Sequence, residues 1–218
     1  MTFTDKAVLV TGATSGIGRA AALKFAAAGA RVALVGRNRE ALDGTRAAMA
    51  AGGDRAVAIQ ADITQEEDVR RVADEAARAL GGLDVLLCAA GVIGTGSIEN
   101  TSYELWDQMM AVNVRSVFRL VQLALPALTP RKGNIVVVSS VNGQRAFPNV
   151  LAYCCSKAAV DQFVMCASLE LAPKGIRINA VNPGVTRTNL HRRSGMSEAD
   201  YAAFVERSRT TLSRPVGA

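Results

Sequence analysis

No apolar run in this 218-residue sequence approaches the roughly 20 residues that a helix needs to cross a bilayer, although half of the residues are hydrophobic. Residues 1–10 also lack the arrangement of a signal peptide. These two absences argue against a membrane-spanning protein and against a secreted one. We therefore expect a soluble protein of the cytoplasm.

Metal-binding patterns are missing too. The four cysteines form no Cys-x-x-Cys pair, and the single histidine gives no zinc spacing with them. A disulfide between the adjacent Cys154 and Cys155 would be strained, because neighbouring helical side chains point apart. Each cysteine lies in an apolar stretch, so we expect buried free thiols and no metal. The four are Cys88, Cys154, Cys155 and Cys166.

Aromatic residues make up only 5% of the chain, and the basic residues are scattered rather than gathered with them. The formal net charge of +6 therefore indicates a solvated basic surface rather than a nucleic-acid site. Nucleic-acid binding stays as a third hypothesis, which predicts salt-sensitive retention on DNA. From residue 185 onward six arginines stand against three acidic residues, an excess of charge that could attract an anionic cofactor or substrate.

Short apolar runs alternate with longer, alanine-rich amphipathic stretches, which is typical of repeated βαβ units. The length suits one domain, because a chain of this size can bury about 70% of its unfolded surface. We predict a single α/β domain over 1–218, with a doubly wound Rossmann-type sheet of six parallel strands, each buried on both faces and flanked by helices. The predicted strands are 7–10, 31–35, 56–60, 84–88, 134–139 and 177–181, and the predicted helices are 17–28, 39–51, 66–79, 102–128 with a break near Asn113, and 152–171.

A glycine-rich turn follows the first predicted strand and leads directly into the first predicted helix. Its glycines, Gly12, Gly16 and Gly18, have the spacing G-x-x-x-G-x-G. Glycine lets a pyrophosphate come close to backbone N–H groups at a helix N-terminus, where the helix dipole favours anions. Strand, turn and helix in this order predict a phosphate-binding turn rather than an ordinary loop.

Tyr153 and Lys157 lie four residues apart on a predicted helix, so their side chains share one face. An ammonium close to a phenol stabilises the phenolate and lowers a pKa that is otherwise about 10. The tyrosine could then act as a general acid and base near neutral pH. Such a pair also arises by chance, so its weight comes from its surroundings.

The turn sequence Thr-Gly-Ala-Thr-Ser-Gly-Ile-Gly, together with Tyr-x-x-x-Lys, resembles the short-chain dehydrogenase/reductase family over the whole chain. The resemblance implies a catalytic tetrad of Asn113, Ser140, Tyr153 and Lys157. Ser140 is assigned rather than Ser139 because it lies thirteen residues before the tyrosine, as the serine of the family does. In relatives the asparagine holds a helix kink and a water that leads from the lysine to solvent.

The resemblance also implies the cofactor contacts. Members that select NAD carry an acidic residue after the second strand, whereas this sequence has Arg37, whose guanidinium can pair with a 2′-phosphate. We predict that NADP(H) is preferred and NAD(H) is the second choice, although Ser15 stands where many NADP-preferring relatives carry a basic residue. The implied contacts are Gly12, Thr14, Ser15, Gly16, Ile17, Gly18, Arg37, Asp62, Ile63, Ala90, Gly91, Tyr153, Lys157, Pro183, Gly184, Val185 and Thr188.

Two of these positions have competing explanations. Asp62 resembles the adenine contact of the family, but a helix N-cap near Thr64 explains it nearly as well. Residues 88–91 have Cys-Ala-Ala-Gly where relatives carry Asn-Asn-Ala-Gly. The lost asparagine amides usually brace neighbouring strands, so we expect local stability to suffer more than catalysis.

The substrate pocket is the least defined part of the prediction. Asn142, Gln144 and Phe147 should line it, under a mobile lid over 186–212. Relatives continue further along the chain with another helix and a seventh strand. Without that strand the backbone of the sixth strand would be exposed at the sheet edge.

The leading hypothesis is an NADP-preferring oxidoreductase that moves a hydride between nicotinamide and a carbonyl or secondary alcohol, with Tyr153 as general acid and base. Similar proteins act on 3-oxoacyl thioesters, steroids, sugars or small ketones, so the expected partner is a small molecule. The alternative is a catalytically idle nucleotide-binding or redox-sensing protein on the same fold. Relatives pair through helices that correspond to 102–128 and 152–171, so a homodimer or homotetramer is expected.

Overall fold

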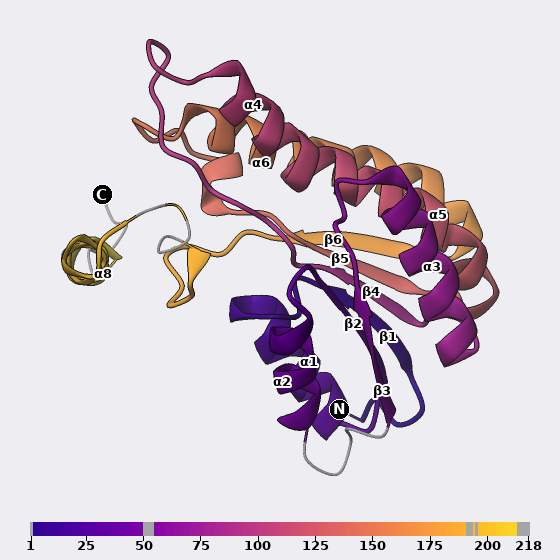
Figure 1. The fold of residues 1–218 in the computed structure, drawn as a ribbon. Helices are drawn as coiled ribbons and strands as arrows, with labels where there is room; N and C mark the ends of the chain where they lie inside the picture. Colours follow the sequence, from indigo (N-terminus) through magenta and orange to yellow (C-terminus); the bar gives the residue numbers. More distant parts are fainter. Residues whose placement is uncertain (1, 50–54, 191–193, 195, 213–218) are drawn as a thin grey trace.

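The computed structural model describes residues 2–49, 55–190, 194 and 196–212. Its centre is a six-stranded sheet in which every strand pair is parallel, in the order β3-β2-β1-β4-β5-β6 (Figure 1). This arrangement confirms the predicted doubly wound α/β fold. The strands are β1 (Ala7–Thr11), β2 (Arg31–Gly36), β3 (Ala56–Gln60), β4 (Val85–Cys88), β5 (Asn134–Val138) and β6 (Arg177–Val181).

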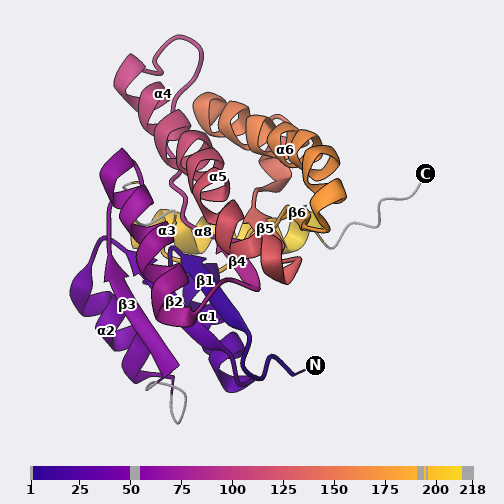
Figure 2. The ribbon, with the colours of Figure 1, turned by 90° about the vertical axis from the view of Figure 1, so that its right-hand side faces the viewer.

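Helices cover both faces of the sheet, as Figures 1 and 2 show. Successive residues of a strand point to opposite faces, so Leu9 joins the apolar core on one face while Val8 and Val10 join the core on the other. The core that contains Leu9 lies under α3 (Glu66–Leu80), α5 (Ser116–Leu128) and α6 (Leu151–Leu171), and the other core lies under α1 (Gly16–Ala27) and α2 (Arg39–Ala47).

The strands differ in how completely they are buried. All residues of β1 and β4 are buried, whereas β6, at the edge of the sheet, alternates exposed and buried residues. Arg177, Asn179 and Val181 are the exposed ones. The expectation that all six strands are buried on both faces is therefore wrong for β6, because the residues that alternate along this strand leave one of its faces exposed. The other edge strand, β3, has one exposed residue, Gln60.

Three helices differ from the prediction. The predicted helix 102–128 is formed by α4 (Tyr103–Met110), a π-helical turn η2 (Ala111–Arg115) and α5, so the expected break near Asn113 is a change of helix type. The second helix, α2, ends at Ala47, short of the predicted residue 51. A further helix, α8 (Glu198–Leu212), lies within the segment predicted as a lid, of which residues 191–193 and 195 are outside the described residues.

Within the described residues, one helix, Tyr103–Arg131, is long and apolar enough to cross a membrane by length and composition. It consists of α4, η2, α5 and the short turn that follows. This helix packs against α3 and α6 in the layer that covers the sheet. Because the core helix of a soluble protein passes the same test, the helix is only weak evidence for a membrane span.

Candidate active site

The glycine turn between β1 and α1 is shaped by backbone atoms that leave no space for a side chain. Gly12 has a φ of +69°, and a Cβ built on it would lie 2.7 Å from the backbone nitrogen of Ala90. A Cβ on Gly18 would lie 2.4 Å from the carbonyl oxygen of Gly12. Only glycine fits either position, and a close backbone approach of this kind is what a phosphate-binding turn requires.

The first turn of α1 is suited to an anion. The N-cap residue, Ser15, makes no side-chain hydrogen bond to the helix, and the first turn contains no acidic residue. Free N–H groups and the positive end of the helix dipole therefore face the turn. The close backbone approach at the glycines and this helix end together fit the pyrophosphate of a dinucleotide.

The segment after β6 lies against this turn. A Cβ on Gly16, whose φ is +55°, would lie 3.1 Å from Cγ2 of Thr188, which places Thr188 directly over the start of α1. Pro183 is tied back to the end of β5, because its carbonyl oxygen accepts a hydrogen bond from the backbone nitrogen of Val141 at 3.1 Å. Val185 is 39% exposed, and a Cβ on Gly184 would meet no atom within 4 Å. The predicted segment thus spans the mouth of the site, with an open surface.

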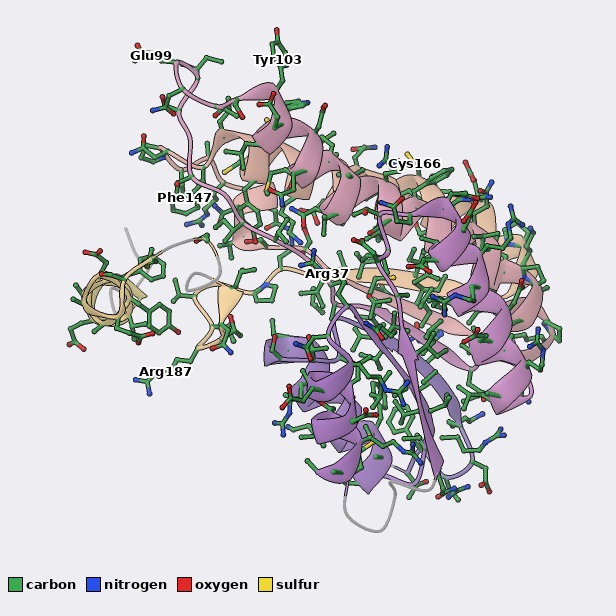
Figure 3. All side chains as sticks on the ribbon, viewed as in Figure 1. Arg37, Glu99, Tyr103, Phe147, Cys166 and Arg187 are labelled. Carbon is green, nitrogen blue, oxygen red and sulfur yellow. The ribbon has the colours of Figure 1, made fainter. Side chains whose placement is uncertain are left out.

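Arg37 lies directly after β2 and is exposed, at the point where the strands end (Figure 3). It lines an open groove of about 930 Å³ together with Asp62 and Thr64, which follow β3, and residues of α4 and η2. No hydrogen bond or ion pair of its guanidinium is found among the described residues. The groove therefore has an exposed cation at its edge.

Asp62 is engaged locally. Its Oδ1 accepts hydrogen bonds from the backbone nitrogen and the hydroxyl of Thr64, at 3.0 and 2.8 Å. The N-cap of α3 is Gln65, so the expectation that Asp62 caps this helix is wrong; it stabilises the turn before it. Ile63 packs against the core. Asp62 still lines the groove, as an adenine contact would.

The backbone at the end of β4, where this chain lacks the asparagines of relatives, is hydrogen-bonded to a threonine of β1. The hydroxyl of Thr11, at the end of β1, accepts hydrogen bonds from the backbone nitrogens of Ala89 and Ala90, at 3.2 and 3.3 Å. Cys88 is buried, and burial raises the pKa of its thiol to about 12. The hydroxyl of Thr11 therefore joins the ends of β1 and β4, and the expected loss of local stability stays a prediction.

Tyr153 and Lys157 lie on the buried face of α6 and face one another. The Nζ of Lys157 is 5.7 Å from the centroid of the Tyr153 ring, and it donates a hydrogen bond to the carbonyl oxygen of Val138 at 2.9 Å. The ammonium also lies near Gly91, since a Cβ on that residue would be 3.6 Å from Nζ. The predicted pair is thus brought to the carboxyl ends of β4 and β5, where ligands of such sheets bind.

Burial sets the protonation of both groups. It raises the pKa of Tyr153 above its ordinary value, and a hydrogen bond with the Ser140 side chain only partly offsets this. Burial also lowers the pKa of Lys157 to about 8, against the opposing effect of the Asp161 carboxylate. On balance the pKa of Tyr153 therefore lies above its ordinary value, not below it as the sequence led us to expect, because burial has the largest effect.

The two serines after β5 have separate partners. Ser140 is hydrogen-bonded to Tyr153, and its hydroxyl also contacts Asn142, which donates from its backbone nitrogen at 3.2 Å. Ser139 donates from its hydroxyl to the carbonyl oxygen of Lys157 at 3.3 Å. Only Ser140 thus reaches the phenol, which supports the choice between the two.

Asn113 lies in the π-helical turn and is 1% exposed. Its Oδ1 accepts from the backbone nitrogen of Val92 at 3.0 Å, while its Nδ2 donates to the carbonyl oxygen of Val92 and to the hydroxyl of Ser156, both at 3.0 Å. A π turn often marks a functional site. Here the turn presents one amide that joins η2, the segment after β4 and α6.

The predicted substrate residues lie in and after the short 3₁₀ turn η4 (Val141–Gly143). Asn142 is half-buried and donates from Nδ2 to Sγ of Cys154 at 3.5 Å, whereas Gln144 and Phe147 are exposed. In Figure 3 Phe147 lies on the same side of the molecule as α8 and Arg187. The structure thus places these residues near the mouth of the site, but only Asn142 contacts the reactive cluster.

The expectation of four buried thiols is wrong. Cys155 and Cys166 are exposed and Cys154 is half-buried, all on α6; Cys88 alone among the four is buried. One side of α6 packs on the molecule and the other faces solvent, although the helix is apolar on both sides. An apolar sequence context therefore did not indicate burial here.

Two residues with contacts at the site were not predicted. Asp161 and Asn182 form a hydrogen bond that joins α6 to the end of β6. They lie 21 residues apart, and no motif links them. Only the position of Asp161, one helical turn after Lys157, could have indicated that it shares the buried face.

Comparisons with known proteins find relatives over most of the chain. Residues 6–199 match the family described as short chain dehydrogenase. The chain is 42% identical over 193 residues to the glucose 1-dehydrogenase of Gluconobacter oxydans (strain 621H), a match covering 87% of this chain and 72% of that protein.

Solved structures are similar as well. A short-chain dehydrogenase/reductase of unknown function from Caenorhabditis elegans, solved with cofactor, has a TM-score of 0.87 and 32% identity, covering 93% of this chain and 78% of that one. The 3-ketoacyl-(acyl-carrier-protein) reductase from Brucella melitensis, complexed with NADH, has a TM-score of 0.82 and 31% identity, covering 87% and 79%.

Proposed function

Because this chain belongs to the short-chain dehydrogenase family, we propose that it prefers NADP(H) and that Tyr153 transfers a proton to or from the substrate oxygen. Members of this family are oxidoreductases of alcohol and carbonyl groups that use NAD(H) or NADP(H). The observation that carries the proposal is the buried cluster of Tyr153, Ser140 and Lys157, which lies beside Gly91 at the carboxyl ends of the strands, the edge of the sheet where the glycine turn also lies. When bound, the nicotinamide supplies or accepts the hydride.

The residues of the chain then provide the proton and the charge. Tyr153, kept protonated by burial, donates its hydroxyl proton to the oxygen of a carbonyl substrate, while the Ser140 hydroxyl hydrogen-bonds to the same oxygen. Lys157 carries a positive charge below a pKa of about 8, so it stabilises the phenolate that remains. Asn113 fixes the backbone at Val92 beside this cluster.

Replacing Tyr153 with Phe tests the proton transfer. The variant keeps the ring and its packing, so NADPH binding should stay within a few-fold of wild type in a calorimetric titration. Turnover, followed as NADPH oxidation over a panel of ketones and aldehydes, should fall about 10²- to 10⁴-fold. Full turnover in the Tyr153→Phe protein would refute the role, and a wild-type protein that reduces no member of the panel would refute the enzyme itself.

The cofactor preference rests on Arg37, which has no side-chain partner among the described residues and lies at the edge of the groove with Asp62. A guanidinium there can pair with the 2′-phosphate of NADP(H). Replacing Arg37 with Asp should weaken NADPH binding about tenfold or more relative to NADH, which is the effect of one lost charge-assisted hydrogen bond. Equal affinities for both cofactors in the wild-type protein would contradict the preference.

We also propose that Asn142, Gln144 and Phe147 line the pocket for a small-molecule carbonyl or alcohol substrate, and that the protein acts in the cytoplasm.

Self-association is proposed through α5 and α6, because Phe118, Met165 and Leu169 on these helices are 47%, 55% and 78% exposed. A homodimer or homotetramer would bury this apolar surface. Sedimentation of wild-type protein and of a Met165→Glu, Leu169→Glu variant would show whether these helices carry the contact.

A further inference from the structure

A single amide joins three elements beside the proposed proton donor. The Nδ2 of Asn182, directly after β6, donates to the carbonyl oxygen of Ser140 at 2.9 Å and to Oδ2 of Asp161 on α6 at 2.8 Å. An NH₂ group has two donors, so both hydrogens of this amide are used. The bridge connects the backbone of Ser140, the ends of β5 and β6, and the helix that carries Tyr153 and Lys157.

Asp161 is held closely against the η4 turn as well. A Cβ built on Gly143 would lie 2.4 Å from Oδ2 of Asp161 and 2.9 Å from the carbonyl oxygen of Lys157. The second carboxylate oxygen, Oδ1, is buried and has no hydrogen-bond partner in the part of the chain that the structure describes. A half-satisfied carboxylate costs free energy, so its presence here calls for a compensating role.

The charge of Asp161 acts on Lys157, one helical turn before it on α6, and opposes the effect of burial on the lysine. The other groups that surround Lys157 are the titratable Tyr153 and Cys154 on the same helix, and uncharged groups on other elements. Those uncharged groups are the carbonyl of Val138 on β5, the backbone at Gly91 after β4, and the amide of Asn113 on η2. Within the described residues Asp161 is therefore the acidic side chain that acts on the lysine.

We infer that Asp161 is a positioning residue of this active site: through Asn182 it fixes the ends of β5 and β6 against α6, and its negative charge holds Lys157 in the cationic state. The inference rests on the proposed function, because it assigns a purpose to the geometry around Tyr153. It predicts two separable effects, one from the hydrogen bond and one from the charge.

Three variants separate these effects. Asp161→Ala and Asn182→Ala each remove the bridge, so each should lower kcat for carbonyl reduction about tenfold, the effect of losing one hydrogen bond to a charged group, and leave the KM for NADPH within a few-fold. The double variant should lose less than the two single losses combined, because both substitutions break the contact between Asn182 and Asp161. Asp161→Asn keeps an oxygen that can accept from Asn182, so most of the kcat at pH 7 should remain.

The charge effect appears in the pH profile. Without the carboxylate, Lys157 should lose its proton at a lower pH, and the alkaline fall of kcat/KM in Asp161→Asn should move to lower pH than in wild type. Gln162→Ala, an exposed neighbour on α6, is the matched control and should give the wild-type profile. Replacing a residue with a merely structural role would not shift the alkaline fall of kcat/KM. Thermal unfolding of each variant reports on structure separately.

Two results would overturn the inference: an Asp161→Asn profile that superimposes on that of wild type, or additive losses in the Asp161→Ala, Asn182→Ala pair. Failure of the proposed function would look different, because wild type itself would then reduce no carbonyl. In that case an NMR titration of ¹³C-lysine protein, assigned with Lys157→Arg, gives the Lys157 midpoint directly. An unchanged midpoint in Asp161→Asn would refute the charge effect without any turnover.

Discussion

The centre of the sheet and one of its edges are built in different ways. Around the glycine turn, β1 and β4 are buried throughout, and backbone atoms leave no room for a Cβ at Gly12 or Gly18. At the edge, β6 alternates exposed and more buried residues, and a Cβ on Gly184, which follows β6, would meet no atom within 4 Å. The comparison teaches that the glycine turn at the centre is held by main-chain geometry, which tolerates little change. The segment after the edge strand is held by a few hydrogen bonds and leaves more freedom.

The strongest test of this contrast is a pair of identical substitutions. Gly18→Ala should destabilise the protein by about 1–3 kcal/mol, because its methyl group would overlap the carbonyl of Gly12, and should weaken NADPH binding about tenfold or more. Gly184→Ala should change the free energy of unfolding by less than about 0.5 kcal/mol. Urea unfolding and calorimetric titration measure both, and equal effects at the two sites would erase the contrast.

A change of stability in the opposite direction should follow from replacing Lys157, whose side chain is buried on α6. Its pKa is about 8 in the folded protein and about 10.5 in an unfolded chain, so the folded state disfavours the charged form. Below pH 8 this cost is fully present, and it disappears as the pH rises from about 8 towards 10.5. Lys157→Met should therefore stabilise the cofactor-free protein by about 1–3 kcal/mol at pH 7.

The pH dependence provides the check on that explanation. The stability difference between Lys157→Met and wild type, from urea unfolding at pH 7, 8 and 9.5, should shrink as the pH increases. A constant difference would mean that packing, rather than the charge, causes it. The same variant should lose carbonyl reduction, so the residue would trade stability for activity.

The smallest effect on stability is expected at the cysteines, one of which lies in the central strand β4 and two on the exposed side of α6. Cys155 and Cys166 on α6 are exposed and should react rapidly with a thiol reagent in the native protein. Cys88, buried in β4 with a thiol pKa of about 12, should react only on unfolding. Cys166→Ser should change stability by less than about 0.5 kcal/mol, and rapid labelling of Cys88 would show that the covered region opens readily.

Much of the fold was predictable because it depends on short-range patterns. Apolar runs indicated all six strands, and their alternation with helices indicated the parallel order. The helix α8 was missed because its sequence shows no regular apolar periodicity, and among its described side chains Tyr201 alone is buried. The exposure of Cys155 and Cys166 was unpredictable for a related reason: an apolar helix does not show which of its sides is covered.

In the site, motifs indicated which residues lie together, but not the direction in which their pKa values are shifted. The spacing of Tyr153 and Lys157 correctly placed both side chains on one face. The direction of the Tyr153 pKa depends on burial by several elements, which no local pattern records. The bridge from Asp161 to Asn182 is likewise a contact between distant parts of the chain, and it becomes visible only when β5, β6 and α6 are assembled.

The π-helical turn at Ala111–Arg115 affects how the long helix can vary in length. A π turn contains one more residue than an α turn, which rotates everything before it by about 100° relative to an uninterrupted α-helix. Because of this offset, Met109 faces Tyr153 while Leu120 and Val121 face the sheet. Deleting one residue there would restore regular winding and turn Met109 away from the phenol. An insertion in α4 or α5 would change which residues face Tyr153 and the sheet, and a change in the other helix could not restore them. We therefore expect substitutions between Tyr103 and Leu128 in related sequences, but few insertions or deletions.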